Sequence, residues 1–83
     1  MEHQKLRENV RVYADFNGQH VRPVAFQWGG KRYDVGRVNL VYRRRLGARY
    51  VWCFAVSDEA HNFVLIYDPE SLQWILEEVS TAV

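Results

Sequence analysis

Hydrophobic and polar residues alternate along the first part of the chain. The apolar positions at a spacing of two are Val10, Val12, Ala14 and Phe16. This period is typical of a β-strand that turns one face toward a core. Asn17-Gly18 follows, a dipeptide that favours a two-residue turn because both central positions of such a turn need a positive φ. We therefore predict a hairpin that pairs Phe16 with Gln19.

The next segment changes its apolar face part of the way along. Its apolar residues are first Val21, Pro23 and Ala25, and then Val24, Phe26 and Trp28. One flat strand cannot turn both sets toward the same core. We therefore predict a bend or bulge near Pro23, which also lacks the N–H group that a regular ladder needs. Gly29-Gly30 predicts a second tight turn, which places Phe26 opposite Tyr33.

The middle of the chain predicts three further strands. Residues 31–45 form one long strand in this interpretation, with a kink at Gly36. The apolar residues expected on one face of it are Val38, Leu40 and Tyr42. Residues 49–57 are apolar on both sides, which is typical of a strand at the centre of a structure. A polar loop over 58–62 then leads to a strand over 63–67.

The C-terminal segment fits two structures. Asp68-Pro69 suits the start of a helix over residues 69–79, because Asp is a good N-cap and Pro is tolerated in the first turn. The apolar residues at helical spacing are Leu72, Ile75, Leu76 and Val79. Alternatively, residues 68–73 form a hairpin loop and residues 74–79 form a last strand. Local rules slightly favour the helix, and both structures stay open.

The length of 83 residues allows one core. We predict a single all-β domain over residues 1–83, with a polar N-terminal segment at 1–9 and a core over 10–79. The expected architecture is a strongly coiled antiparallel sheet or open barrel of five to six strands in consecutive hairpins. The alternative is five strands followed by a C-terminal helix at about 69–79. The sequence lacks a signal-peptide pattern and an apolar run of membrane-spanning length, so we expect a cytoplasmic protein without membrane contact.

Few residues suggest catalysis. Cys53 is the only cysteine and lies among aromatic residues in a predicted strand, where a small thiol packs well. His20 is expected opposite Asp15 beside the first turn, which is a common cross-strand polar pair. We expect both His20 and Cys53 to be structural.

The remaining candidates for acid–base or metal chemistry are a histidine and two carboxylates. His61 has acidic neighbours in its loop, but no second histidine lies at metal-ligand spacing. Glu77 and Glu78 are adjacent, and adjacent residues in a strand point to opposite faces. We expect no catalytic residue, cofactor or metal site, and no pocket that brings His20 or His61 within reach of Cys53 or a carboxylate.

Charge is distributed unevenly along the chain. Residues 31–49 carry seven basic side chains and one acidic side chain, a net charge of +6, whereas residues 50–83 carry six acidic side chains and no Lys or Arg. The whole chain has a net charge of only +1. The basic and acidic regions could simply lie beside each other and offset each other, because surface charges are often no more than solvated.

Two functional interpretations compete with that structural one. Clustered arginines would contact phosphates, and aromatic side chains would stack on unpaired bases. Alternatively, the basic region at 31–49 and the acidic region at 50–83 would serve a protein–protein contact, with an acidic partner or with a second copy. The candidate contact residues are Arg43, Arg44, Arg45, Arg49, Tyr42, Tyr50 and Trp28.

Two stretches of sequence resemble a known family. These are V-x-F-x-W-G-G-K-R-Y-x-V at Val24 to Val35 and Y-D-P-x-x-x-x-W-x-L-E-E-V at Tyr67 to Val79. They resemble a family of small bacterial domains of unknown function, whose members are often encoded beside or fused to error-prone DNA polymerases. The resemblance covers roughly Val10 to Val79. It implies a C-terminal strand that closes a hairpin, usually with Gly in the turn where this chain has Ser71-Leu72.

We expect a non-catalytic interaction module that binds nucleic acid or an acidic protein. The resemblance alone adds a role accessory to DNA repair or replication. A self-associating module and a small enzyme remain the alternatives, and the expected state is a monomer or weak homodimer.

Overall fold

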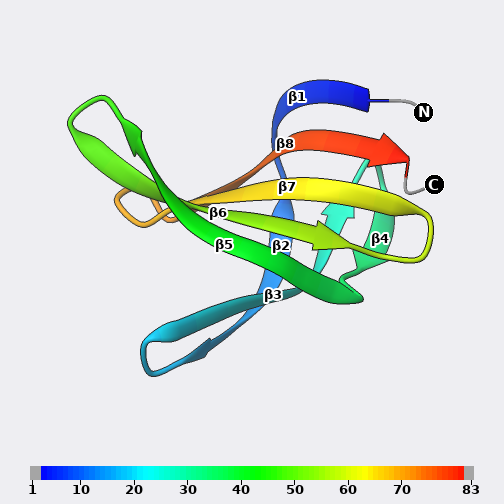
Figure 1. The fold of residues 1–83 in the computed structure, drawn as a ribbon, viewed down its shortest axis with the longest axis horizontal. Coiled ribbons are helices and arrows are strands. Elements are labelled where there is room, and N and C mark those ends of the chain that lie inside the picture. Colours follow the sequence, from blue (N-terminus) through cyan, green and yellow to red (C-terminus); the bar gives the residue numbers. More distant parts are fainter. Residues whose placement is uncertain (1–2, 82–83) are drawn as a thin grey trace.

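Eight antiparallel strands form two sheets in the computed structural model, which describes residues 3–81 (Figure 1). The strands are β1 (His3–Asn9), β2 (Arg11–Asn17), β3 (His20–Trp28), β4 (Lys31–Asp34), β5 (Arg37–Leu46), β6 (Arg49–Ser57), β7 (His61–Asp68) and β8 (Gln73–Thr81). The larger sheet has the order β1-β8-β7-β6-β5, and the smaller sheet has the order β2-β3-β4. The prediction of an all-β antiparallel domain is confirmed, with eight strands rather than five or six. The sheets do not close into a barrel.

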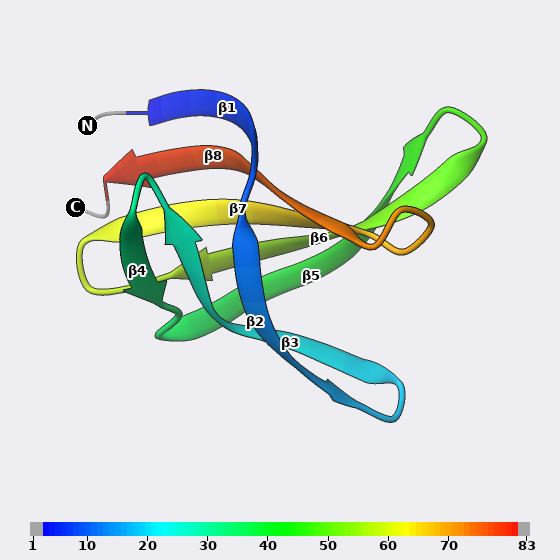
Figure 2. The ribbon, with the colours of Figure 1, turned by 180° about the vertical axis from the view of Figure 1, so that it is seen from behind.

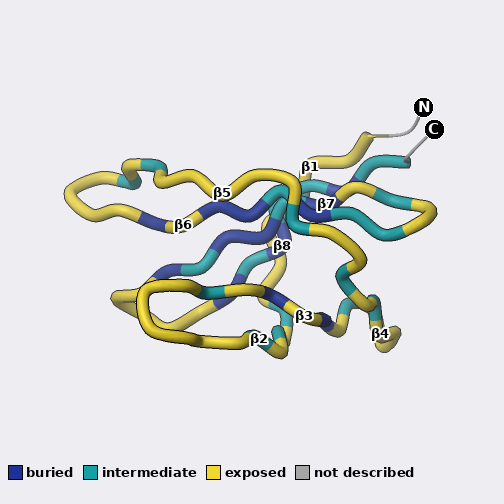
Figure 3. Tube along the Cα trace, turned by 60° about the horizontal axis from the view of Figure 1, so that its bottom comes forward, coloured by how far each residue is buried: buried dark blue, intermediate teal, exposed yellow. Residues whose placement is uncertain are grey.

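The main core lies between the two sheets. Its buried members are Phe26, Phe54, Val56, Phe63, Leu65, Trp74, Leu76 and Val79. Phe26, from the smaller sheet, is fully buried and contacts the ring of Phe63 edge-on at a centroid distance of 4.9 Å. Figure 3 shows this buried layer, while the ends of the β2–β3 and β5–β6 hairpins are mostly exposed.

The chain passes from one sheet to the other at two corners. At each corner the structure differs from the prediction. The segment at 1–9 was expected to be a polar extension, but residues 3–9 form edge strand β1 on β8, and Val10 alone separates β1 from β2 (Figure 2). The long strand expected over 31–45 is two strands in different sheets. Gly36 lies at this second corner, where its N–H donates to the carbonyl of Ser57 at 2.9 Å. A Cβ at Gly36 would lie 3.2 Å from the same oxygen, so the tight approach favours glycine.

The first turn differs from its predicted register by one residue. Asn17 pairs with His20 and Phe16 with Val21, so the central turn residues are Gly18 and Gln19. Only Gly18 of these two has a positive φ, which is the pattern of a type II′ turn rather than the expected type I′. The prediction that Phe16 pairs with Gln19 is therefore wrong. His20 also does not lie opposite Asp15, which pairs with Arg22 instead.

The second turn and the bulge of β3 agree with the sequence. Both Gly29 and Gly30 have a positive φ, and Phe26 pairs with Tyr33 as predicted. The ladder between β2 and β3 is irregular where Tyr13 pairs with Ala25 and Ala14 pairs with Pro23, which leaves Val24 as the extra residue. The bulge near Pro23 is thus confirmed. Val24 itself is exposed and does not face the core with Phe26 and Trp28.

The C-terminal segment is a strand, so the helix over 69–79 is ruled out. The turn before β8 contains Leu72, which has a φ of 62° and donates its N–H to the carbonyl of Asp68 at 2.7 Å. Leu72 thus adopts the left-handed conformation for which glycine is the usual residue. Residues 3–81 contain no helix of any kind, and therefore no helix of sufficient length and apolar character to span a bilayer.

Strand β6 has buried side chains on both faces, as expected of a central strand. Phe54 belongs to the core between the sheets, and its neighbour Cys53 points to the opposite face. On that second face Val51, Cys53 and Ile66 form a smaller buried cluster. The larger sheet therefore has an inner face toward the smaller sheet and an outer face that covers this second cluster.

Candidate functional site

The outer face of the larger sheet brings Arg44 and Glu77 together. The two guanidinium nitrogens of Arg44 donate to the two carboxylate oxygens of Glu77 at 3.0 and 2.7 Å. Glu77 occupies a bulge of β8, since the β7–β8 register shifts from Leu65–Leu76 to Val64–Glu78. The hydrogen bond from Arg44 lowers the pKa of Glu77 below its ordinary value. A bidentate pair of this kind fixes both side chains.

A second arginine of the predicted patch is also paired with an acidic residue. Arg49 donates through two nitrogens to one oxygen of Asp68, at 2.9 and 3.2 Å. The other oxygen of Asp68 accepts the N–H groups of Glu70 and Ser71 in the turn that follows. Desolvation alone would raise the pKa of Asp68, but these hydrogen bonds lower it below its ordinary value.

These two ion pairs border the smaller buried cluster. Cys53 lies inside it with no exposed surface, and burial raises the pKa of its thiol. Tyr42 is directly opposite Cys53 in the β5–β6 ladder and shares its face. Burial also raises the pKa of the Tyr42 hydroxyl. Cys53 is therefore a buried packing residue, as the sequence predicts, and Tyr42 belongs to this same surface.

The inner face of the β5–β6 hairpin carries a different set of side chains. Arg43 pairs with Trp52, Arg45 pairs with Tyr50, and side chains of directly paired residues lie on one face. We call this surface the arginine–aromatic face. Its residues are Val41, Arg43, Arg45, Tyr50 and Trp52, all of them exposed.

The two arginines of this face are held without a carboxylate. The guanidinium of Arg43 lies over the ring of Tyr50, 4.4 Å from its centroid. Arg45 donates its Nε hydrogen to the carbonyl of Gly47 at 3.1 Å. Within residues 3–81, neither Arg43 nor Arg45 makes an ion pair. Their positive charges thus remain available at the surface.

The structure divides the predicted contact residues among three places. Arg43, Arg45 and Tyr50 lie on the arginine–aromatic face, whereas Tyr42, Arg44 and Arg49 lie on the outer face. Trp28 is in neither set, because it ends β3 and packs against Tyr33 at a centroid distance of 5.8 Å. The acidic segment at 50–83 therefore neutralises Arg44 and Arg49 but leaves Arg43 and Arg45.

Two residues of this face were absent from the sequence-based set. Trp52 is 41% exposed and Val41 is 45% exposed. Alternation gave a usable signal for Trp52, because it is in phase with Tyr50 along β6. Val41 could not be placed in this way. Asn39 is an extra residue in the ladder, and this bulge shifts the phase of β5, so that Val38 and Val41 share a face.

The bulge at Asn39 also corrects the predicted face of β5. Val38, Leu40 and Tyr42 were expected together on one face. Instead Leu40 pairs with Ala55 and Tyr42 with Cys53 on the outer face, where both are exposed. Val38 remains packed against the main core.

A groove adjoins the arginine–aromatic face. The β2–β3 and β5–β6 hairpins both project to the left of the molecule in Figure 1, and the groove lies between them. Its volume is about 370 Å³. We call it the hairpin groove, and its lining residues are Gln19, His20, Val21, Val41, Trp52, Phe54, Tyr67 and Pro69. Phe16 contacts Tyr67 edge-on at 5.9 Å and so links the β2–β3 hairpin to β7 of the larger sheet.

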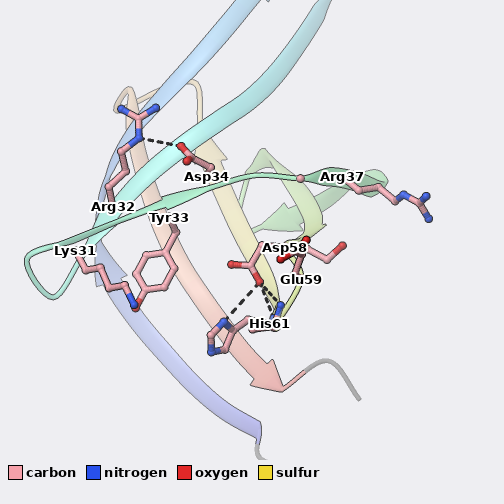
Figure 4. A pocket seen from close by; sticks show the side chains of 11 residues that line it. Lys31, Arg32, Tyr33, Asp34, Arg37, Asp58, Glu59 and His61 are labelled. Atoms are coloured by element: carbon pink, nitrogen blue, oxygen red, sulfur yellow. Dashed lines mark hydrogen bonds and ion pairs between the residues drawn. The ribbon is translucent and has the colours of Figure 1, made fainter.

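A second pocket lies beside the corner at Gly36 and has a volume of about 690 Å³ (Figure 4). Here Nδ1 of His61 lies 3.6 Å from a carboxylate oxygen of Asp58. The expectation that no pocket would bring His61 near a carboxylate is therefore wrong. The same oxygen accepts the N–H groups of Ala60 and His61, so Asp58 is used to order its own loop.

The charges around this second pocket largely offset one another. Arg32 pairs with Asp34 at 2.9 Å, and Lys31 lies over the ring of Tyr33. Figure 4 shows Arg37 directed away from His61. In the part of the chain that the structure describes, no group of three His, Cys, Asp or Glu side chains is arranged to hold a metal ion.

Comparison with known proteins adds no relative. No family model matches the chain, and neither the curated proteins nor the solved structures contain a match. The resemblance to the polymerase-associated family stays a prediction from the two sequence motifs. The arginine–aromatic face and the hairpin groove are therefore the two features of the molecule that bear on its function.

Proposed function

We propose that this protein is a non-catalytic module that binds single-stranded nucleic acid through the arginine–aromatic face. One observation carries the proposal. Arg43 and Arg45 have no carboxylate partner within residues 3–81 and share an exposed face with Tyr50 and Trp52. Arginine side chains neutralise phosphates, and exposed aromatic rings stack on unpaired bases.

The arrangement suits an extended strand better than a duplex. The arginines lie on β5 and the aromatic side chains lie directly opposite on β6, so the two kinds of contact run in parallel rows along the hairpin. A single strand offers phosphates on one side and unstacked bases on the other. In a duplex the flat faces of the bases are already stacked on one another and are not available to Trp52 or Tyr50.

The alternative of self-association by opposite charge has less support. It requires the basic region at 31–49 of one copy to meet the acidic region at 50–83 of another. Within one chain, Arg44 already binds Glu77 and Arg49 already binds Asp68. Association by these groups would break pairs that exist in the monomer, and the exchange would give little net free energy.

The affinity for a labelled oligothymidylate tests the proposal. We expect the double variant Arg43→Gln/Arg45→Gln to bind at least tenfold more weakly than the unmodified protein at about 50 mM salt. The matched control is Arg11→Gln/Arg37→Gln, which removes the same charge from exposed positions elsewhere. The unmodified protein should show a log–log salt dependence with a slope of about −1.4 if two phosphates are neutralised.

Two results would contradict the proposal. One is that the unmodified protein does not bind single-stranded DNA or RNA at about 50 mM salt, where phosphate contacts are strong. The other is that the control variant loses as much affinity as the double variant, because binding would then follow net charge rather than this face. The resemblance to the polymerase-associated family is the support for a proposed role accessory to DNA repair or replication.

A further inference from the structure

The hairpin groove continues the arginine–aromatic face across to the smaller sheet. Trp52 and Val41 belong to both surfaces. The far wall is formed by Gln19, His20 and Val21 at the end of the β2–β3 hairpin. A strand that follows the arginine–aromatic face would therefore pass the mouth of the groove.

We propose that the hairpin groove holds one unstacked nucleobase of the bound strand. This inference rests on the proposed function and adds that recognition occurs at a pocket as well as on an open surface. The occupant is the base of a single-stranded nucleotide, and its phosphate is held by the adjacent arginines. The pairing of Arg43 with Trp52 favours this occupant, because the strand that carries the two arginines without an ion-pair partner within residues 3–81 lies directly beside the strand that carries the groove wall. The guanidinium of Arg43 itself lies over Tyr50, two residues from Trp52 on the same face.

The lining of the groove suits a flat, partly polar ring. Trp52, Tyr67 and Pro69 supply apolar surface from the larger sheet. Tyr67 is held in place by contact with the tilted ring of Trp74, at a centroid distance of 4.8 Å, and by an edge-on contact with Phe16. A wall fixed in this way loses little conformational freedom when a base packs against it. The site is therefore largely formed before the ligand arrives.

The other side of the groove supplies hydrogen-bonding groups. Gln19 carries an amide donor and acceptor, and His20 in its neutral form carries one donor and one acceptor. Both lie in or beside the first turn, within the lining of the groove. Because they face the apolar wall across it, the edge of a bound base can reach polar groups while its flat surface packs on aromatic ones.

Photo-crosslinking provides the test with the protein unaltered. An oligothymidylate of about eight nucleotides, within the site size of small single-strand binders, would carry one 5-iodouracil near its centre. Irradiation joins this base to an aromatic side chain that it contacts. We expect the crosslinked peptides to contain His20 or Tyr67, which line the groove and do not belong to the arginine–aromatic face. Crosslinks confined to Tyr50 or Trp52, or to any residue outside the groove, would overturn the inference while leaving the proposed function intact.

A pair of variants gives a second measurement. Tyr67→Leu removes a groove wall, and Tyr13→Leu removes a partly exposed tyrosine from the smaller sheet, away from the groove. Circular dichroism would check that both variants are folded. We expect Tyr67→Leu to weaken binding of the oligothymidylate about tenfold and Tyr13→Leu to leave it unchanged. Equal binding by a folded Tyr67→Leu would contradict the groove, whereas absence of binding by the unmodified protein contradicts the proposed function itself.

Discussion

At the scale of single residues, the four neighbouring arginines of the β5–β6 hairpin have different roles. Strand alternation turns Arg44 to the outer face, where it meets Glu77, and turns Arg43 and Arg45 to the inner face. Arg49 donates hydrogen bonds to the carboxylate of Asp68 and is therefore also paired. The three consecutive arginines therefore have two roles. Arg44 is a structural residue, whereas Arg43 and Arg45 on either side of it make no ion pair within residues 3–81.

This difference predicts losses of stability of unequal size for adjacent substitutions. Arg44→Ala leaves the carboxylate of Glu77, which is only 16% exposed, without its partner, so we expect the free energy of unfolding to fall by about 1 to 2 kcal/mol. Arg43→Ala removes an exposed cation–π contact, and the expected loss is about 0.5 kcal/mol or less. Urea denaturation of both variants measures the contrast. Equal losses would show that the Arg44–Glu77 pair is not a stabilising contact.

The same pair predicts a dependence of stability on pH. The pKa of Glu77 is lowered from its ordinary value of 4.5 because Arg44 binds the ionised form. In acidic solution the unfolded chain therefore binds a proton that the folded protein does not. The stabilisation is complete above pH 4.5 and is lost as the pH falls through the lowered pKa of the folded state. Glu77→Gln should lose less stability than the unmodified protein across that window, as measured by thermal unfolding in a pH series. If the two proteins lost stability equally as the pH falls, Glu77 would not be the source of this pH dependence.

At the scale of elements, irregular ladders decide which side chains face inward. The bulge at Glu77 brings Leu76 and Val79 to the same core, although they are three positions apart in the strand. That spacing is also helical, and for this reason the C-terminal pattern fitted a helix. The bulge at Asn39 likewise moves Leu40 and Tyr42 to the face opposite to that of Val38, which the alternation pattern did not predict. A single bulge residue reverses the faces of all the residues that follow it in the strand. The identity of the bulge residue gives no sequence signal for the bulge.

The turn before β8 offers a prediction about its backbone. Leu72 has a φ of 62° and is 72% exposed, so it carries the strain of a left-handed conformation without a packing benefit. We expect Leu72→Gly to raise the free energy of unfolding by about 0.5 to 1 kcal/mol. Glu70→Gly, at a position without a positive φ in the same turn, should lower it. Chemical denaturation distinguishes them, and a destabilised Leu72→Gly would show that the turn conformation is wrong.

At the scale of the whole molecule, the alternation of apolar residues and the hairpin signals were sufficient to predict an all-β domain. The separation into two sheets was not predictable from local patterns. It depends on Val10 and Gly36, two corners at which the chain leaves one sheet for the other. The candidate site combines residues from both sheets, so His20 and Tyr67 could not be placed together before the corners were known. Its arginines and Tyr50, by contrast, lie within one hairpin and were identified from the sequence.

The fold also shows where the basic and acidic regions of the chain meet. Within residues 3–81, the ion pairs between the acidic C-terminal region and the basic hairpin lie on the outer face of the larger sheet. On the inner face, which meets the hairpin groove, Arg43 and Arg45 make no ion pair with any residue that the structure describes. The arginines on β5 also protect an edge strand from pairing with other chains, which is a structural role compatible with binding.

An NMR titration of the isotopically labelled protein with an oligothymidylate tests the central claim most directly, because it reports on every backbone amide at once. We predict that the largest chemical-shift changes fall on the β5–β6 hairpin, at Arg43, Arg45, Tyr50 and Trp52. Smaller changes should extend across the groove to His20. Changes centred instead on Lys31, Arg37 and His61 at the second pocket, or no changes at about 50 mM salt, would contradict the account.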